Sequence, residues 1–118
     1  DRQRLYERIN LRVDLMLENG LVEEVEKLLD KGYNREMQAL KAIGYKEMAR
    51  YLSGEESLDE ALDRIRMESR RYAKRQLTWL RRDERYRWFY PDDYEQPELL
   101  YRRMEQEVRS FLCGQQDA

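Results

Sequence analysis

The sequence predicts an all-α fold of about five helices, and three observations support this prediction. Charged and hydrophobic residues each make up 41% of the 118 residues, a balance typical of solvated helices around a small core. The chain contains only two prolines. Apolar residues recur at spacings of three and four through most of its length, as they do along one face of an α-helix.

Two short helices are predicted at the start of the chain. The first follows an apolar pattern, and Asn19-Gly20 ends it because glycine readily adopts the left-handed conformation of a helix terminus. The second pattern begins at Leu21 and ends at Gly32. Almost no loop separates the two helices, so we expect a helical hairpin. The apolar residues of the first helix are Leu5, Ile9, Val13 and Met16.

A short helix and a long helix are predicted in the middle of the chain. Residues 33–43 are expected to form a loop with a short helical turn, and helical spacing resumes after Gly44. Ser53-Gly54 ends this short helix. Ser57 to Glu60 have the sequence of a capping box, which begins the longest helix. That helix is expected to reach about Arg82, a length of roughly 37 Å at a rise of about 1.5 Å per residue.

The carboxyl-terminal part is predicted to contain an extended segment and one more helix. Residues 87–90 are mostly aromatic and favour a short strand or an extended segment, although the chain offers no partner strand. Pro97 suits the first turn of the last helix. We expect residues 1–112 to form the helical part and residues 113–118 a disordered tail. The expected buried face of the last helix consists of Leu99, Leu100, Met104, Val108, Phe111 and Leu112.

The composition excludes several kinds of chemistry. Histidine is absent and Cys113 is the only cysteine, so we expect no metal ligands and no thiol–histidine site. The five glycines form no phosphate-binding loop. A lone cysteine fits a reducing compartment, so a cytoplasmic location is expected. No apolar run approaches the roughly 20 residues that span a bilayer, so no membrane association is expected.

Basic residues are concentrated in one segment. Residues 64–87 carry a net charge of +7, whereas the whole chain carries −2. Arg66, Arg70 and Lys74 are four apart and form one ridge on the long helix, with Arg71 and Arg75 beside it. Such a ridge is either a solvated face or a surface for a polyanion such as nucleic acid. The aromatic residues on the apolar stripe of the same helix, Tyr72 and Trp79, are expected in the core.

Arg12 is the other unusual residue. It shares one line with the apolar residues of the first helix, so we expect its guanidinium at the edge of the buried face. A partly buried arginine normally requires an anionic partner. The alternatives are a salt bridge to an acid such as Glu23 or Glu47, a side chain whose stem lies along the apolar surface, or a phosphate ligand.

Several stretches, in their order and spacing, resemble the carboxyl-terminal portion of the tRNA dimethylallyltransferase family. The resemblance extends from Arg4 to about Leu112. The stretches that carry it are Leu5–Ile9, Arg12–Asp14 with Met16, Gly20–Val25, Ala42–Glu47 and Ala73–Trp79.

The resemblance implies a tRNA-modifying enzyme. Members of the family use Mg²⁺ and transfer a dimethylallyl group from dimethylallyl diphosphate to N6 of the adenosine 3′ of the anticodon. Their phosphate loop and general base lie in an upstream α/β domain that this sequence does not contain. The chain is therefore expected to be inactive alone and to bind no Mg²⁺, while the complete enzyme is expected to be a monomer.

The resemblance also implies site residues. Arg12 corresponds to a catalytic arginine that faces the diphosphate, and residues 34–39 and 67–74 fall where the family contacts the anticodon stem-loop of tRNA. Glu68 and Arg71 depart from the asparagine and glutamine expected in many relatives. Together with the basic ridge, the expected tRNA-binding residues are Asn34, Arg35, Gln38, Arg66, Met67, Ser69, Arg70, Arg71, Lys74, Arg75 and Gln76.

Two other functions compete with this interpretation. One is a non-enzymatic helical module that binds a partner protein through an exposed apolar patch. The other is a general RNA binder without transferase ancestry, for which Arg12 has no role. The aromatic residues of the predicted protein-binding patch are Trp79, Trp88, Phe89 and Tyr90.

Overall fold

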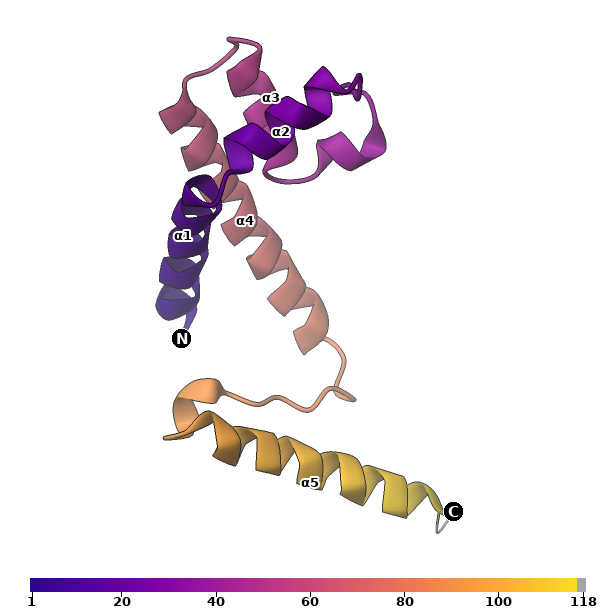
Figure 1. Cartoon of the computed structure of the whole chain (residues 1–118). Coiled ribbons are helices and arrows are strands. Elements are labelled where there is room, and N and C mark those ends of the chain that lie inside the picture. The colour runs from indigo at the N-terminus through magenta and orange to yellow at the C-terminus, as the bar shows by residue number, and fades with distance from the viewer. Residues whose placement is uncertain (117–118) are drawn as a thin grey trace. The chain divides into compact units, whose positions relative to one another are not determined.

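The computed structural model describes residues 1–116, and within them every regular element is a helix (Figure 1). This confirms the predicted all-α fold and its five main helices. These are α1 (Arg2–Glu18), α2 (Leu21–Asp30), α3 (Tyr45–Leu52), α4 (Leu58–Arg81) and α5 (Pro97–Gln116), with the short 3₁₀ helices η1 (Gln38–Lys41) and η2 (Pro91–Asp93). None of the described helices is both long enough and apolar enough to cross a bilayer.

The chain divides into two compact units, residues 1–79 and residues 80–118. The first unit contains α1, α2, η1, α3 and nearly all of α4. The second contains the last residues of α4, an irregular segment, η2 and α5. The sequence had indicated a single helical part over residues 1–112.

The predicted helix ends are set by local backbone chemistry. Gly20 has a φ of +97°, in the left-handed region that favours glycine, so the chain changes direction between α1 and α2. Its amide donates a hydrogen bond of 3.2 Å to the carbonyl of Leu17. At the start of α4, the hydroxyl of Ser57 accepts a 3.1 Å hydrogen bond from the amide of Glu60, as the capping-box sequence predicts.

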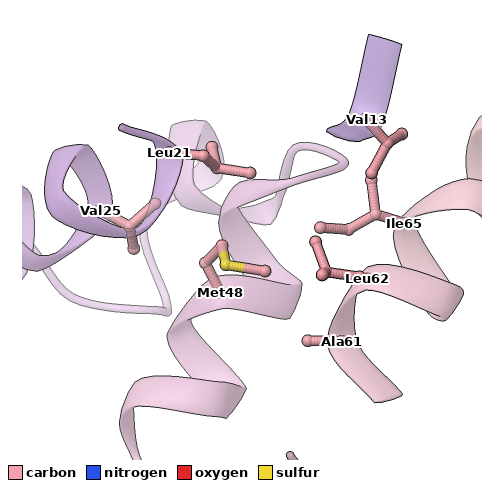
Figure 2. Packing of buried hydrophobic residues seen from close by; sticks show 7 residues of the cluster. All are labelled: Val13, Leu21, Val25, Met48, Ala61, Leu62 and Ile65. Atoms are coloured by element: carbon pink, nitrogen blue, oxygen red, sulfur yellow. The ribbon is translucent and has the colours of Figure 1, made fainter. Parts of the chain in front are cut away.

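The core lies entirely in the first unit and draws on four helices. Figure 2 shows Val13 of α1 pointing toward Ile65 of α4, and Met48 of α3 between the residues of α2 and those of α4. Full burial of each large side chain contributes roughly 1.5–3 kcal/mol, and nine partly buried hydrophobic residues pack against this cluster. The core residues are Val13, Leu21, Val25, Met48, Ala61, Leu62 and Ile65.

A buried carboxylate organises the start of α3. Glu47 is fully buried, and its Oε2 accepts a 2.7 Å hydrogen bond from the amide of Gly44. Gly44 has a φ of +102°, so a side chain there would strain the turn that this hydrogen bond holds. The sequence did not reveal that Glu47 is buried, because its neighbours Lys46 and Arg50 are charged and give it the appearance of a surface residue.

The second unit has no core comparable to that of the first within the described residues. The backbone of Tyr90 is extended, and residues 86–90 form no strand, which fits the extended alternative. The guanidinium of Arg81 lies 5.9 Å from the ring centre of Trp88, within cation–π range.

Two expectations for the last helix are wrong. Its apolar face is exposed, and Phe111 retains 64% of its accessible surface, because the irregular segment of this unit is too small to cover a 20-residue helix. The other exposed members of that face are Leu99, Met104, Val108 and Leu112. The helix also continues to Gln116, where the sequence predicted a disordered tail from residue 113. Asp117 and Ala118 lie outside the described residues.

Candidate nucleic-acid interface

The basic ridge of α4 is divided by the fold into a paired part and an open part. Arg66 belongs to the paired part: its Nη2 donates to Asp14 Oδ1 at 2.6 Å and its Nη1 to Asp63 Oδ1 at 2.8 Å. The hydrogen bond to Asp14 is the largest cause of the raised pKa of Arg66. This arginine therefore joins α4 to α1, an internal role that the sequence did not predict; its contact with tRNA stays a prediction.

Arg70 forms the next link between the same helices. Its Nη1 donates to Asn10 Oδ1 at 2.9 Å. Asn10 is four residues before Asp14, as Arg66 is four before Arg70, so α1 and α4 run antiparallel with two matched contacts. Because an amide carries no charge, the positive charge of Arg70 is not neutralised by this contact. Both spacings are visible in the sequence, but the pairing of the two helices is not.

The open part of the ridge follows Arg70. Arg71 is exposed and forms an i, i+3 ion pair of 3.5 Å with the half-buried Glu68. Lys74 and Arg75 are exposed, and no side chain in residues 1–114, where side chains are described, forms an ion pair with either. Tyr6, one turn before Asn10 on α1, has no carboxylate, and Lys74, one turn after Arg70 on α4, is exposed. This surface has the charge that a polyanion requires.

Two aromatic residues extend the open surface. Tyr72 and Trp79 retain 56% and 65% of their accessible surface, so the expectation that they belong to the core is wrong. The buried residues of α4 are Ala61, Leu62 and Ile65, so they end about two turns before Tyr72. With Arg75 and Gln76, the two aromatic residues line a shallow pocket of about 300 Å³. Exposed aromatic rings beside a guanidinium suit the stacking of unpaired bases.

The other candidate contact residues of α4 differ in their exposure. Met67 and Ser69 are half-buried, and Gln76 is exposed. The hydroxyl of Thr78 donates to the carbonyl of Lys74 at 2.9 Å, so it is engaged with the helix backbone. The predicted contact residues of α4 thus include open, half-buried and internally bonded side chains.

The loop between α2 and α3 forms a separate patch. Asn34 Oδ1 accepts a 2.9 Å hydrogen bond from the amide of Glu36, and Gln38 is exposed at the start of η1. Arg35 donates two hydrogen bonds to Glu55, at 2.7 and 3.0 Å. Figure 1 shows this loop at the far end of α2, apart from the second half of α4. The fold therefore does not merge the two predicted groups into one continuous surface.

Arg12 is exposed, where the sequence placed it at the edge of the buried face. Neither acid weighed as its partner pairs with it: Glu47 contacts the Gly44 amide and lies 3.7 Å from Lys46 Nζ, and Glu23 forms no ion pair with Arg12. Among the side chains that the structure describes, those of residues 1–114, Arg12 has no hydrogen-bond or ion-pair partner. The guanidinium, with five N–H donors, is thus available to an outside anion.

Metal ions in proteins are held by sets of histidine, cysteine, aspartate and glutamate side chains. Residues 1–116 contain no cluster of three or more histidine, cysteine, aspartate or glutamate side chains able to hold an ion. Cys113 is exposed on α5.

Sequence and structure comparisons agree on the relatives of this chain. Residues 1–83 match the family model IPPT, described as IPP transferase. The tRNA dimethylallyltransferase of Acetivibrio thermocellus is 48% identical over 111 residues, which cover 94% of this chain and 36% of that protein. That of Clostridioides difficile is 54% identical over 95 residues, which cover 80% and 30%.

Two solved structures resemble the chain closely. The tRNA isopentenylpyrophosphate transferase of Bacillus halodurans is 46% identical, with a TM-score of 0.81, over 97% of this chain and 36% of that one. The tRNA delta(2)-isopentenylpyrophosphate transferase of Staphylococcus epidermidis is 37% identical, with a TM-score of 0.82, over 92% and 36%. The chain thus spans about a third of the length of the relatives it matches.

Proposed function

Because this chain belongs to the IPP transferase family, we propose that it is the RNA-facing carboxyl-terminal part of a tRNA dimethylallyltransferase. The complete enzyme transfers a dimethylallyl group from dimethylallyl diphosphate to N6 of the adenosine 3′ of the anticodon. The observation that carries the proposal is the match of 97% of this chain to 36% of a solved tRNA isopentenylpyrophosphate transferase. Alone, this part is inactive, because it lacks a phosphate-binding loop and a general base.

In the proposed reaction Arg12 acts on the leaving group. The adenosine N6 attacks C1 of dimethylallyl diphosphate, the C1–O bond breaks, and pyrophosphate leaves with the bonding electrons while N6 loses a proton. A guanidinium donates paired hydrogen bonds to phosphate oxygens and stabilises the charge that develops on them. The exposure of Arg12 and the absence of an internal partner in the described residues support this role.

The second half of α4 holds the RNA in this proposal. Target adenosines must leave the stacked loop before N6 is accessible, so phosphates on either side need to be fixed. Arg70, Lys74 and Arg75 supply positive charge without a neutralising carboxylate, and Tyr72 and Trp79 offer faces for unstacked bases. Asn34, Arg35 and Gln38 contribute a second contact from the loop after α2.

The remaining partners of the proposed enzyme follow from its chemistry. Mg²⁺ supplies charge stabilisation at the diphosphate, and since the described residues offer no ligand set for it, the ion is assigned to the upstream part of the protein. The enzyme works as a cytoplasmic monomer, without membrane association, on the anticodon stem-loop of tRNA.

The alternative of a protein-interaction module draws support from the exposed apolar face of α5. We assign that face to contact with the rest of the same protein, since the relatives that match this chain are more than twice its length. On this view the 118-residue chain self-associates through α5, and a protein carrying the upstream two thirds does not. Equal self-association of both would favour the interaction module.

A chimera tests the proposed function. In it, this chain replaces the matching 36% of the Bacillus halodurans relative, so the upstream part comes from a protein of known structure. We expect the chimera to transfer labelled dimethylallyl groups to an anticodon stem-loop RNA, and the 118-residue chain to transfer none. A folded chimera that binds the diphosphate substrate but modifies no RNA would refute the proposal.

A further inference from the structure

We propose that Asn10 and Asp14 are positioning residues for Arg12. Through hydrogen bonds to α4 they hold the part of α1 that carries this arginine, and so they set the direction in which its guanidinium points. The inference rests on the proposed function, because that function supplies the diphosphate that Arg12 contacts. Neither Asn10 nor Asp14 is assigned a contact with substrate, so both act on the reaction through Arg12.

Arg12 lies just outside the part of α1 that the core holds. The residues of α1 that belong to the core or pack against it are Val13, Met16 and Leu17, and all three follow Arg12 in the chain. Figure 1 shows α1 and α4 coming together near the turn into α2 and diverging toward the amino terminus of α1. Core packing therefore holds α1 on only one side of Arg12.

Hydrogen bonds to α4 extend this support to the other side of Arg12. Asp14 Oδ1 accepts a hydrogen bond from Arg66 Nη2 at 2.6 Å. Asn10 Oδ1 accepts one from Arg70 Nη1 at 2.9 Å, and this contact is partly buried, where a hydrogen bond is stronger than in water. The two contacts lie one turn apart along α1, so together they resist rotation of the helix about its axis, which a single contact would permit.

The same two contacts determine the side of α1 on which Arg12 lies. Residues two positions apart in an α-helix differ by about 200° around its axis, so Arg12 lies nearly opposite to both Asn10 and Asp14. Because Asn10 and Asp14 face α4, Arg12 faces away from it, in agreement with its exposure. Rotation of α1 would swing the guanidinium away from the leaving group, and a misplacement of about 1 Å can lower a rate by about 100-fold.

Asp63 provides a matched control for these contacts. Its Oδ1 accepts a 2.8 Å hydrogen bond from Nη1 of Arg66, the same arginine that binds Asp14. Asp63 lies on α4 itself, three residues before Arg66, so this bond does not join α4 to α1. Removing Asp63 therefore deletes an acid beside the same arginine and leaves the link between the helices in place.

A double-mutant cycle in the chimera tests whether Asn10 and Asp14 act through Arg12. Asn10→Leu with Asp14→Leu removes both acceptors and keeps good helix formers in α1. Turnover is measured at saturating dimethylallyl diphosphate and stem-loop RNA. We expect the leucine pair to lower kcat about tenfold when Arg12 is present, but less than about twofold when Arg12 is replaced by alanine. Asp63→Leu should leave kcat nearly unchanged in both backgrounds.

Two further readouts separate positioning from a loss of structure. Asp14→Asn keeps an acceptor oxygen for Arg66, so it should retain kcat to within about twofold, whereas Asp14→Leu should not. Hydrogen exchange of the α1 amides does not depend on turnover. In the leucine pair it should become about tenfold faster over residues 2–12, because that part of α1 then opens more often, and Asp63→Leu should leave it unchanged.

An equal loss of kcat with and without Arg12 would overturn the inference, because the leucine pair would then act on the enzyme by another route. Unchanged kcat and exchange in that pair would overturn it as well. If the pair unfolds the chimera at the assay temperature, Asn10→Ala alone is carried through the same cycle, with an expected loss of about threefold that disappears without Arg12. An unmodified chimera that transfers no group would refute the proposed function, whereas the exchange measurement would still report on the contacts with α4.

Discussion

The two units of this chain differ in whether the apolar faces of their amphipathic helices are buried. In residues 1–79 the apolar faces of four helices close on one another, and core residues such as Val25 and Met48 are fully buried. In residues 80–118 the apolar face of the 20-residue helix α5 is exposed, although its apolar residues recur just as regularly. The comparison teaches that periodicity identifies the face of a helix that favours burial, but does not reveal whether the covering surface belongs to the same stretch of chain.

The largest contrast is expected in stability. Met48→Ala should lower the free energy of unfolding by about 2–5 kcal/mol, because it removes a fully buried side chain and leaves a cavity. Phe111→Ala in the isolated chain should change it by no more than about 0.5 kcal/mol, since that ring is exposed. Urea unfolding followed by circular dichroism measures both. Equal losses would show that α5 is packed after all.

The next contrast concerns turnover. Arg12→Ala in the chimera should lower kcat by about 100-fold, because the leaving pyrophosphate then has one charged donor fewer. The isolated chain should keep its stability, since Arg12 is exposed. Arg8→Ala on the same helix and Arg102→Ala in the second unit serve as controls and should leave kcat nearly unchanged. Near-normal turnover in the Arg12 variant would remove it from the reaction.

A smaller difference is expected between the effects on RNA affinity of substitutions in α4 and of substitutions in α5. Lys74→Ala with Arg75→Ala should weaken binding of the stem-loop RNA and lower the salt slope by about 0.7–0.9 for each phosphate that the variant no longer neutralises. Arg102→Ala with Arg109→Ala removes the same charge from α5 and should have little effect. Filter binding at several salt concentrations gives both values. If the two pairs behave alike, the open surface of α4 is merely solvated.

The smallest effect is a difference in pH dependence. The pKa of Glu55 is lowered by hydrogen bonds from Arg35, twenty residues away, and unfolding removes that partner. A carboxyl with a depressed pKa in the fold contributes stability above its unfolded pKa and loses it as pH falls through the folded value. The pKa of Asp83 is lowered by Arg85, only two residues away, so unfolding separates that pair less.

Carboxyl NMR titration in the native chain and in urea measures this difference. The pKa of Glu55 should rise on unfolding, and Arg35→Gln should raise it in the native state. The pKa of Asp83 should rise less. A larger rise for Asp83 would mean that the irregular segment is held by more than its local ion pair.

Most of the fold was predictable because its signals are local. The left-handed turn at Gly20, the serine cap of α4 and the spacing of apolar residues are all set by neighbours within four positions. These signals placed five helices and the ends of α4 within a residue or two of their observed bounds. The final turn of α5 was missed, because a polar sequence at a chain end resembles a tail.

The candidate site was less predictable, since exposure and pairing depend on distant residues. Tyr72 and Trp79 continue the stripe of Ile65, and only the fold shows that the core ends before them. Arg66 and Lys74 are both basic residues of the ridge on α4, but Arg66 donates a hydrogen bond to Asp14 of α1 and Lys74 is exposed. The proposed role of Arg12 came from the resemblance to a known family. Neither the position of Arg12 in its helix nor its exposure distinguishes a phosphate ligand from another surface arginine.

Binding of an anticodon stem-loop RNA, beside a duplex RNA of equal length, tests the central claim most directly. The chimera should bind the stem-loop more tightly than the duplex, with a steep decrease in affinity as salt rises. The preference should weaken when Lys74 and Arg75 are both replaced by alanine. Equal affinity for the two RNAs, unchanged by that replacement, would contradict the assignment of α4 as an RNA-facing surface.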